Sequence, residues 1–261
     1  MHSIQPTLNT YWSSRSAAYH DAQTSTARAP FEQDLWATTF RNALNMEAAT
    51  IIDAGCGSGF VSHILAADGH TVRGVDASQG MIDQARAEAR RQAELGFNPA
   101  SFTLGNAISP KLPAASVDAV ISRYLLWTLT DPVAALRNWA RITRPGGRVV
   151  IADGLWFPQG INPDTQVDST AGSDAFTRAY DAHTMAQLPL GQRVTTQEYA
   201  EAFHQAGLED VQVNEITATR ELDARFGLSK GHESAQQFTV SGVVTEATHR
   251  QHATAMAFEQ A

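Results

Sequence analysis

Residues 50–59, TIIDAGCGSG, join a short apolar run to a glycine-rich turn, and this stretch decides the fold of the chain. The run from Thr50 to Ala54 is typical of a strand buried on both faces of a parallel sheet. Glycines let the backbone turn tightly and approach a ligand without a Cβ clash, and the first turn of a following helix offers free N–H groups. The stretch therefore predicts a strand, a ligand-binding turn and a helix over residues 60–68.

The same alternation of strands and helices continues along the chain. Ser78 is an N-cap residue type and predicts a helix to about Glu94, while Asp131 followed by Pro132 opens another helix. The order predicts an α/β fold with a mostly parallel sheet and helices on both of its faces. Further strands are predicted at Thr71–Asp76, Ser101–Asn106, Ser116–Arg123, Arg148–Ala152, Asp210–Ile216 and Gln237–Val244.

Three segments depart from this alternation and suggest a division of the chain. Residues 1–48 precede the first strand and are expected to form an N-terminal helical lid, with its clearest helix at Pro30–Leu44. Residues 155–194 lack clean periodicity and are interpreted as an inserted cap, because long insertions are usually functional. Thr195 and Glu198 then have capping-box spacing. The core domain is placed at residues 49–244, and residues 245–261 are taken as a C-terminal tail.

Composition excludes several classes of protein. The 261 residues carry a net charge of −8, which argues against a nucleic-acid binder, since phosphate contacts require a basic face. No apolar run approaches the roughly 20 residues that cross a bilayer, so no membrane partner is expected. The single cysteine, Cys56, precludes an intrachain disulfide and fits a reducing compartment. We expect a cytoplasmic protein, either a monomer or a homodimer.

The ends of the predicted strands carry the candidate ligand-binding residues, because ligands of open α/β sheets bind at the carboxyl ends of the strands. Asp76 ends the second strand, 17 residues after Gly59, and an acid there can accept hydrogen bonds from ribose hydroxyls. Met81 can lie against a flat base, and the Asn106 amide can bond to its edge. The turn reads G-x-G-x-G, with Phe60 where a dinucleotide fingerprint has its third glycine.

Five segments together resemble the class I, Rossmann-like S-adenosylmethionine-dependent methyltransferases of the small-molecule type. They are IIDAGCGSGF, VRGVDAS with Met81, LGNA, SVDAVISRYLLWTL and RPGGRVVIAD, all within residues 50–154. Residues 195–244 agree with the family in topology only, and QFTVSGVV fits its antiparallel seventh strand. The resemblance implies a seven-stranded sheet and metal-independent transfer of a methyl group to an O, N, S or C atom of a small-molecule metabolite.

The resemblance also implies roles for individual residues around S-adenosyl-L-methionine as the cofactor. Asp53 and the turn containing Gly55, Cys56, Gly57 and Gly59 would hold its amino acid end. Asp76 would bind the ribose, and Ala77, Met81, Asn106 and Ala107 would contact adenine. The family more often has Asp where Asn106 stands, and an amide oxygen can still accept from the adenine amino group. Arg123 would lie near the methionine moiety.

Residues on the acceptor side are less well defined by the sequence. The candidates for catalysis are Tyr11, Tyr19, Arg123, Tyr124 and His183, and those for substrate binding are Trp12, Arg15, Trp127, Trp156 and Tyr180. Metal-dependent catechol methylators carry acidic ligands after the fourth strand, where Ser122 and Arg123 stand, so no metal is expected. The alternatives are an NAD-dependent oxidoreductase, a non-catalytic binding subunit that keeps the fold, and an aminopropyl transferase.

Overall fold

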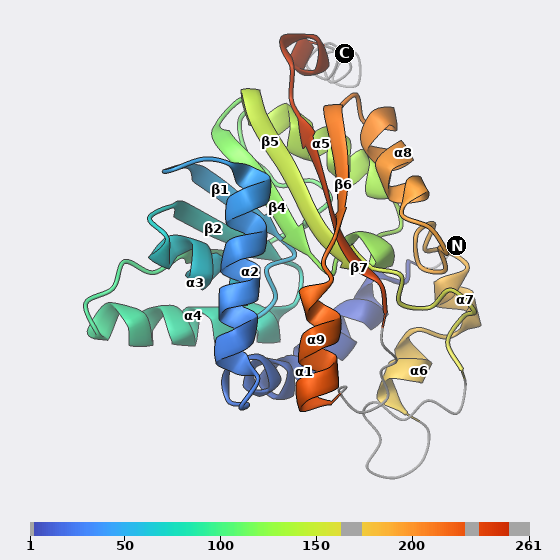
Figure 1. Cartoon of the computed structure of the whole chain (residues 1–261). Coiled ribbons are helices and arrows are strands. Elements are labelled where there is room, and N and C mark those ends of the chain that lie inside the picture. Colours follow the sequence, from blue (N-terminus) through green and yellow to red (C-terminus); the bar gives the residue numbers. More distant parts are fainter. Residues whose placement is uncertain (1–2, 163–173, 228–234, 251–261) are drawn as a thin grey trace.

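A computed structural model describes residues 3–162, 174–227 and 235–250 of the chain. Its sheet has the order β3-β2-β1-β4-β5-β7-β6, and β7 runs antiparallel to both of its neighbours while the other pairs are parallel. This confirms the predicted α/β fold with a mostly parallel seven-stranded sheet (Figure 1). The strands are β1 Thr50–Ala54, β2 Thr71–Asp76, β3 Ser101–Leu104, β4 Val117–Arg123, β5 Thr143–Gly154, β6 Glu209–Glu215 and β7 Gln237–Val243.

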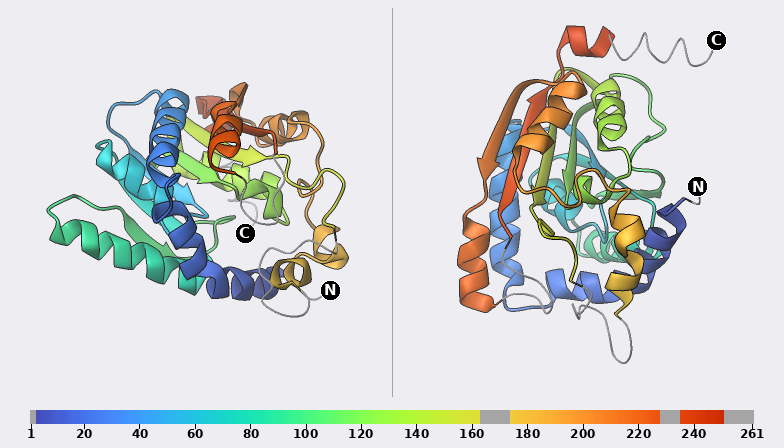
Figure 2. Two further views of the ribbon diagram at one scale, coloured as in Figure 1. Left: turned by 60° about the horizontal axis from the view of Figure 1, so that its bottom comes forward. Right: turned by 90° about the vertical axis from the view of Figure 1, so that its right-hand side faces the viewer.

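Helices cover both faces of the sheet, and two apolar cores result. Successive side chains of a strand point to opposite faces of the sheet. Ile51 therefore belongs to the core that contains α2 and α3, and Ile52 to the core that contains α5 and α8. Figure 2 shows α1 lying across one end of the sheet, beside α6. The helices are α1 Gln5–Thr24, α2 Ala29–Leu44, α3 Phe60–Ala67, α4 Gln79–Glu94, α5 Pro132–Ile142, α6 Ala175–Ala179, α7 Ala182–Met185, α8 Gln197–Gln205 and α9 Ala218–Phe226, with a short 3-10 helix at Leu126–Thr128.

Local capping signals were confirmed at two helices and wrong at a third. The Ser78 hydroxyl accepts from the Met81 amide at the start of α4, and Asp131 accepts from the Ala134 amide at the start of α5. Helix α8 instead begins after Thr196, whose side chain makes no cap bond. The hydroxyl of Thr195 contacts the Glu198 carboxylate directly, so the predicted capping box, in which each side chain bonds a backbone amide, does not form.

Several element boundaries differ from the sequence-based expectation. Strand β3 ends at Leu104, where its pairing with β2 stops at Asp76. Strand β5 begins at Thr143, before the predicted start, and the register with β4 shifts before Arg148. Helix α9 was not predicted at all, and the short helices α6 and α7 lie within the segment expected to be an irregular cap. The division into lid, core, cap and tail remains a prediction, and residues 251–261 of the tail lie outside the described residues.

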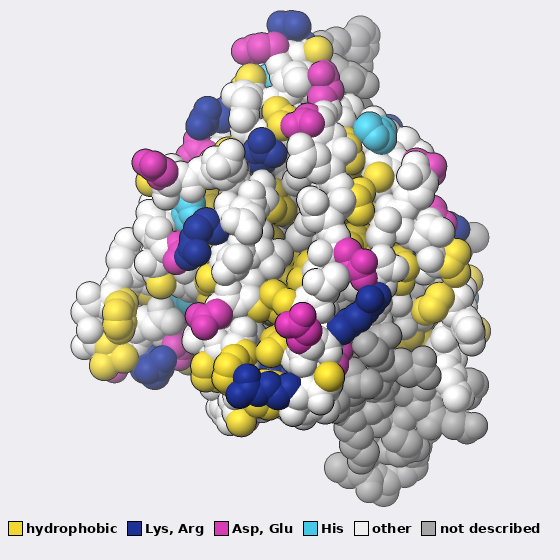
Figure 3. Space-filling view, in the orientation of Figure 1, with side chains coloured by type: hydrophobic (Ala, Val, Ile, Leu, Met, Phe, Trp, Pro, Cys, Tyr) yellow, Lys and Arg dark blue, Asp and Glu magenta, His cyan; other side chains and the backbone are white. Residues whose placement is uncertain are grey.

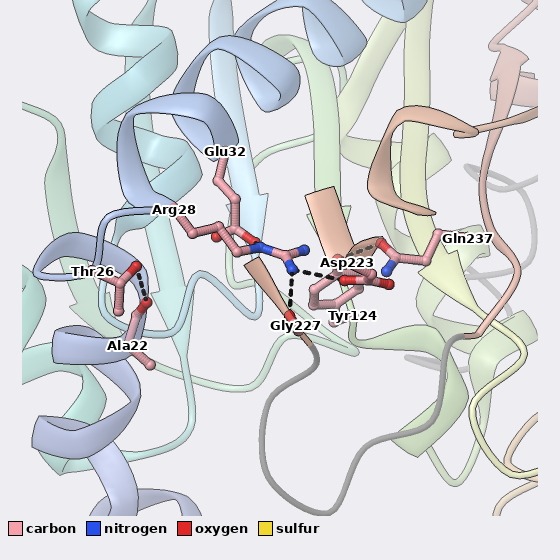
Figure 4. Close-up of polar contacts among 8 residues, drawn as sticks. All are labelled: Ala22, Thr26, Arg28, Glu32, Tyr124, Asp223, Gly227 and Gln237. Atoms are coloured by element: carbon pink, nitrogen blue, oxygen red, sulfur yellow. Dashed lines mark hydrogen bonds and ion pairs between the residues drawn. The ribbon is translucent and has the colours of Figure 1, made fainter. Parts of the chain in front are cut away.

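Acidic and basic side chains are interspersed over the face formed by α2 and α9 (Figure 3). One ion-pair group on this face joins the two helices. The Arg28 guanidinium donates to Glu32 and to Asp223, both at 2.7 Å, and to the Gly227 carbonyl at 3.3 Å (Figure 4). Arg28 lies in the short turn between α1 and α2, so these bonds fix the position of the turn that joins the two helices. No helix among the described residues is long and apolar enough to cross a membrane.

Candidate functional site

The carboxyl ends of β1, β2, β3 and β4 open into one cavity, and α1 forms its opposite wall. The sheet therefore gathers residues that are far apart in the sequence, as expected for the edge of an open parallel sheet. The lining consists of Gly55, Gly57, Asp76, Ala77, Ser78, Met81, Asn106, Ala107, Ile108, Arg123, Tyr124, Leu125, Thr128 and Leu129 from the core, and of Gln5, Leu8, Asn9, Trp12 and Tyr19 from α1.

The glycine-rich turn after β1 has a backbone that only glycine adopts readily. Gly55 has a φ of 70° and Gly57 a φ of 54°, values in the left-handed region that side chains disfavour. A Cβ added at Gly55 would lie 2.7 Å from the Leu125 side chain. At Gly59 an added Cβ would instead meet the side chain of Phe102, at 2.7 Å. Gly59 therefore lets α3 pack closely on the sheet and is outside the described cavity lining.

Asp76 organises this turn from the end of β2. Its carboxylate accepts from the Gly57 amide at 2.9 Å and from the Ser78 amide at 2.8 Å. Burial raises the pKa of Asp76, and the backbone donors of Ser78 and Gly57 oppose that rise. The carboxylate thus lies in the cavity wall, where it holds the glycine turn in place and faces the enclosed space.

A smaller cavity adjoins the first, behind the glycine turn. Its walls are Tyr19, Gln23, Asp53, Gly55, Cys56, Gly57, Val61 and Arg123. The buried carboxylate of Asp53 accepts from the Ser62 hydroxyl at 2.6 Å. Burial raises the pKa of Asp53 to about 6, which the Ser62 bond and the nearby Arg123 charge oppose. Gln23 and Ser62 were not identified from the sequence, because both act through contacts with residues distant along the chain or on the far side of the turn.

Arg123 is held by aromatic rings at the end of β4. Its guanidinium carbon lies 5.0 Å from the Trp36 ring centre, 5.2 Å from Phe60 and 4.6 Å from Tyr124, which is the geometry of cation–π attraction. Tyr124 has a φ of 59° and donates its hydroxyl to Gln237 at 2.6 Å (Figure 4). The Arg123 side chain lies in the wall that the two cavities share.

The remaining acceptor-side candidates fall into two groups. Trp12, Tyr19 and Tyr124 line the main cavity. Tyr11, Trp127 and Tyr180 are buried in an aromatic cluster, and Trp156 packs edge-on against Tyr124. Arg15 and His183 are absent from the described lining of both cavities. His183 is exposed on α7, where its Nε2 lies 3.0 Å from the Gln187 amide. The structure therefore does not bring this histidine to the cavity.

Asp153 is a buried acid at the end of β5 that sequence reasoning did not single out. Its carboxylate accepts from the Trp156 indole at 2.9 Å, from the Gly154 amide at 2.9 Å and from the Trp127 amide at 3.2 Å. Burial raises its pKa to about 7 in spite of these donors. The acid thereby ties both tryptophans to the sheet beside the cavity.

The raised pKa of Asp153 makes stability depend on pH. The folded protein keeps this proton up to about pH 7, whereas the unfolded chain loses it near pH 4, about the ordinary value for Asp. The folded state therefore binds more protons between these values, and the stability from Asp153 falls as the pH rises from about 4 to 7.

We expect Asp153→Asn to flatten the decline in unfolding free energy between pH 5 and pH 8, measured by urea denaturation. Asp83→Asn, at an exposed site, should leave the slope as it is; equal slopes in all three proteins contradict the assignment.

Comparison with known proteins finds a likeness to methyltransferases in part of the chain. Residues 52–151 match the model of a methyltransferase domain. The chain is 30% identical over 139 residues to a malonyl-[acyl-carrier protein] O-methyltransferase of Serratia marcescens, covering 53% of this chain and 49% of that protein. It is 36% identical over 116 residues to an aklanonic acid methyltransferase of Streptomyces sp. (strain C5), covering 43% and 51%. The chain thus spans about half the length of these relatives.

A solved structure extends the likeness beyond the matched residues. A geranyl diphosphate C-methyltransferase from Streptomyces coelicolor A3(2), in complex with Mg²⁺, geranyl diphosphate and S-adenosyl-L-homocysteine, superposes with a TM-score of 0.59 at 21% identity, covering 82% of this chain and 79% of that one. The fold is therefore the Rossmann-like fold of class I methyltransferases. The domain match covers the glycine turn and runs from β1 into β5, so this part of the chain is similar to a methyltransferase domain, and the solved structure shares its fold.

Proposed function

We propose that this protein transfers a methyl group from S-adenosyl-L-methionine to a small-molecule acceptor. The observation that carries the proposal is the bond between the Asp76 carboxylate and the Gly57 amide, which brings the ends of β1 and β2 together in one cavity. That arrangement combines a close-approach glycine turn with an acid able to bind vicinal hydroxyls. The names of the methyltransferase relatives support the reaction class.

The cavity residues fit the parts of this cofactor. Asp53, Gly55, Cys56, Gly57, Gly59 and Arg123 form the turn and the walls proposed for its amino acid end, with Gly59 acting through helix packing. Asp76 is proposed to accept from the ribose hydroxyls, since its carboxylate lies in the wall and both oxygens retain acceptor capacity. Met81, Ala77 and Ala107 offer an apolar place for adenine. The Asn106 side-chain oxygen already accepts from the Ile108 amide at 2.8 Å, which leaves its NH₂ group as the free donor.

The chemistry asks mainly for positioning. Held by these residues, S-adenosyl-L-methionine would supply an activated methyl carbon for attack by a nucleophilic electron pair of the acceptor. The protein residues hold the acceptor in line with the methyl group and exclude water. The apolar wall of Leu8, Trp12, Leu125 and Leu129 serves that exclusion. The proposal covers acceptor atoms O, N, S and C.

The experiment that tests the proposal is calorimetric titration of the purified protein with S-adenosylhomocysteine, beside an identical titration with NADH. We expect saturable binding of S-adenosylhomocysteine and none of NADH, because Phe60 occupies the place of the third glycine in a dinucleotide turn. A screen of small-molecule acceptors for a mass gain of one methyl group then follows. Binding of NADH alone overturns the proposal in favour of an oxidoreductase, and binding of S-adenosylhomocysteine with no methylated product in the screen points to a binding subunit.

A further inference from the structure

Two side chains from separate segments, Trp12 and Thr128, contact the hydroxyl of a third, Tyr180, beside the main cavity. The Trp12 indole of α1 donates to the Tyr180 hydroxyl at 2.8 Å, and Thr128, in the 3-10 helix after β4, shares a bond of 2.9 Å with the same hydroxyl. Trp12 and Thr128 line the cavity, whereas Tyr180 is 1% exposed behind them. Tyr180 also stacks on Trp127, with ring centres 5.0 Å apart, so its position is fixed.

The protons of this group can be counted. The Trp12 N–H is used, because Tyr180 accepts it. Tyr180 and Thr128 each carry one hydroxyl proton, but they share a single hydrogen bond. One hydroxyl proton is therefore left over, and the two residues make no other side-chain hydrogen bond among the described residues. The question is which of the two hydroxyls keeps its proton free.

Burial decides the direction of the shared bond. Burial raises the pKa of Tyr180 to about 12, so its hydroxyl stays protonated at neutral pH. If Thr128 donated, the Tyr180 proton would be left without an acceptor inside the core, at a cost of about 1–3 kcal/mol. If Tyr180 donates, the spare proton belongs to Thr128, which is half-buried in the cavity wall. The second arrangement leaves the donor where a ligand can reach it.

Apolar side chains form part of the cavity wall that contains Thr128. They include Leu8, Ile108, Leu125 and Leu129, so a donor among them is a strong discriminator between ligands. We propose that Thr128 donates a hydrogen bond to an oxygen of the methyl acceptor, and that Tyr180 positions Thr128 for this contact. The acceptor class is an apolar molecule carrying a carbonyl or similar hydrogen-bond-accepting oxygen. The inference rests on the proposed function, since it takes the Thr128 side of the cavity as the acceptor side.

The test uses two neutral probes of nearly equal shape, 2-acetylnaphthalene and 2-isopropenylnaphthalene, which differ in a carbonyl oxygen against a methylene group. Binding is measured by quenching of tryptophan fluorescence, with and without saturating S-adenosylhomocysteine. We expect wild-type protein to prefer the acetyl probe five- to tenfold, the gain of one hydrogen bond. Thr128→Val should abolish the preference while keeping the side-chain volume, and Thr128→Ser should keep it. Tyr180→Phe should reduce it, because Thr128 then loses its fixed orientation.

Thr130→Val is the matched control, since Thr130 is exposed two residues away, and it should retain the wild-type preference. An undiminished preference in Thr128→Val overturns the proposal, as does equal affinity of the wild type for both probes or binding of neither. Titration with S-adenosylhomocysteine alone distinguishes failure of the proposed function from failure of the role proposed for Thr128. If it fails while a Thr128-dependent preference persists, the proposed function is contradicted; if it succeeds without that preference, the role of Thr128 is contradicted.

Discussion

Asp76→Ala is expected to weaken binding of S-adenosylhomocysteine at least tenfold while the protein remains folded. The carboxylate is the proposed partner of the ribose hydroxyls, and charged hydrogen bonds of this kind contribute about 1.5–3 kcal/mol. The substitution also removes the acceptor for the Gly57 amide, so the glycine turn loses the contact that holds it against β2. Both effects act in the same direction, and titration calorimetry measures their sum.

Two companion variants make the result specific. Asp83→Ala removes an exposed acid from α4, whose partner is Gln79 on the same helix, and should leave the affinity unchanged. Asp76→Asn keeps one oxygen and should fall between the alanine variant and the wild type. Circular dichroism of all three proteins reports whether the fold is retained. Unchanged affinity in Asp76→Ala would falsify the assignment of Asp76 to the ribose.

Trp139→Ala is expected to lower the free energy of unfolding by about 3–5 kcal/mol, the range for truncating a large buried aromatic side chain. Trp139 lies on α5 with no exposed surface, and its indole donates to the Ala107 carbonyl at 2.7 Å. The substitution therefore opens a hole between α5 and the sheet and leaves a carbonyl without its donor. Urea denaturation followed by circular dichroism measures the loss without relying on tryptophan fluorescence.

Trp139→Phe separates packing from hydrogen bonding at this position. It keeps an aromatic ring in the core but cannot donate to Ala107, so we expect a smaller loss than in the alanine variant. Because Ala107 lines the cavity, both variants should also weaken S-adenosylhomocysteine binding, by less than Asp76→Ala does. A loss of stability below about 1 kcal/mol in Trp139→Ala would contradict the role of α5 as a main part of the core.

The elements that the sequence predicted well are those with strong local signals. Strands β1 and β2 have the predicted bounds: β1 is a short apolar run that ends at the glycine turn, and β2 ends at Asp76. The caps of α4 and α5 were also confirmed, since a cap depends on residues within one turn of helix. The residues proposed at the sheet edge came together for the same reason, because parallel strands deliver their carboxyl ends to a common side.

The features that the sequence did not reveal depend on distant contacts. Helix α9 has a single buried residue, Thr219, and the bond between Asp223 and Arg28 ties it to a distant part of the chain. The Tyr124 hydroxyl meets Gln237 across 113 positions of sequence. The exposed place of His183 likewise follows from the packing of α7 and has no local signature. These contacts form only in the tertiary structure, and neither hydrophobic periodicity nor capping residues predict them.

Helix α1 supplies a whole wall of the cavity, and only the short turn ending at Arg28 joins it to α2. A covalent tether of this length makes docking of α1 an intramolecular event, with an effective concentration on the millimolar scale or above. The helix also fits tightly, because the Ser13 carbonyl would be 2.5 Å from any Cβ at Gly80. Because of this tether, docking of α1 against α4 costs less translational entropy than docking of a separate chain would.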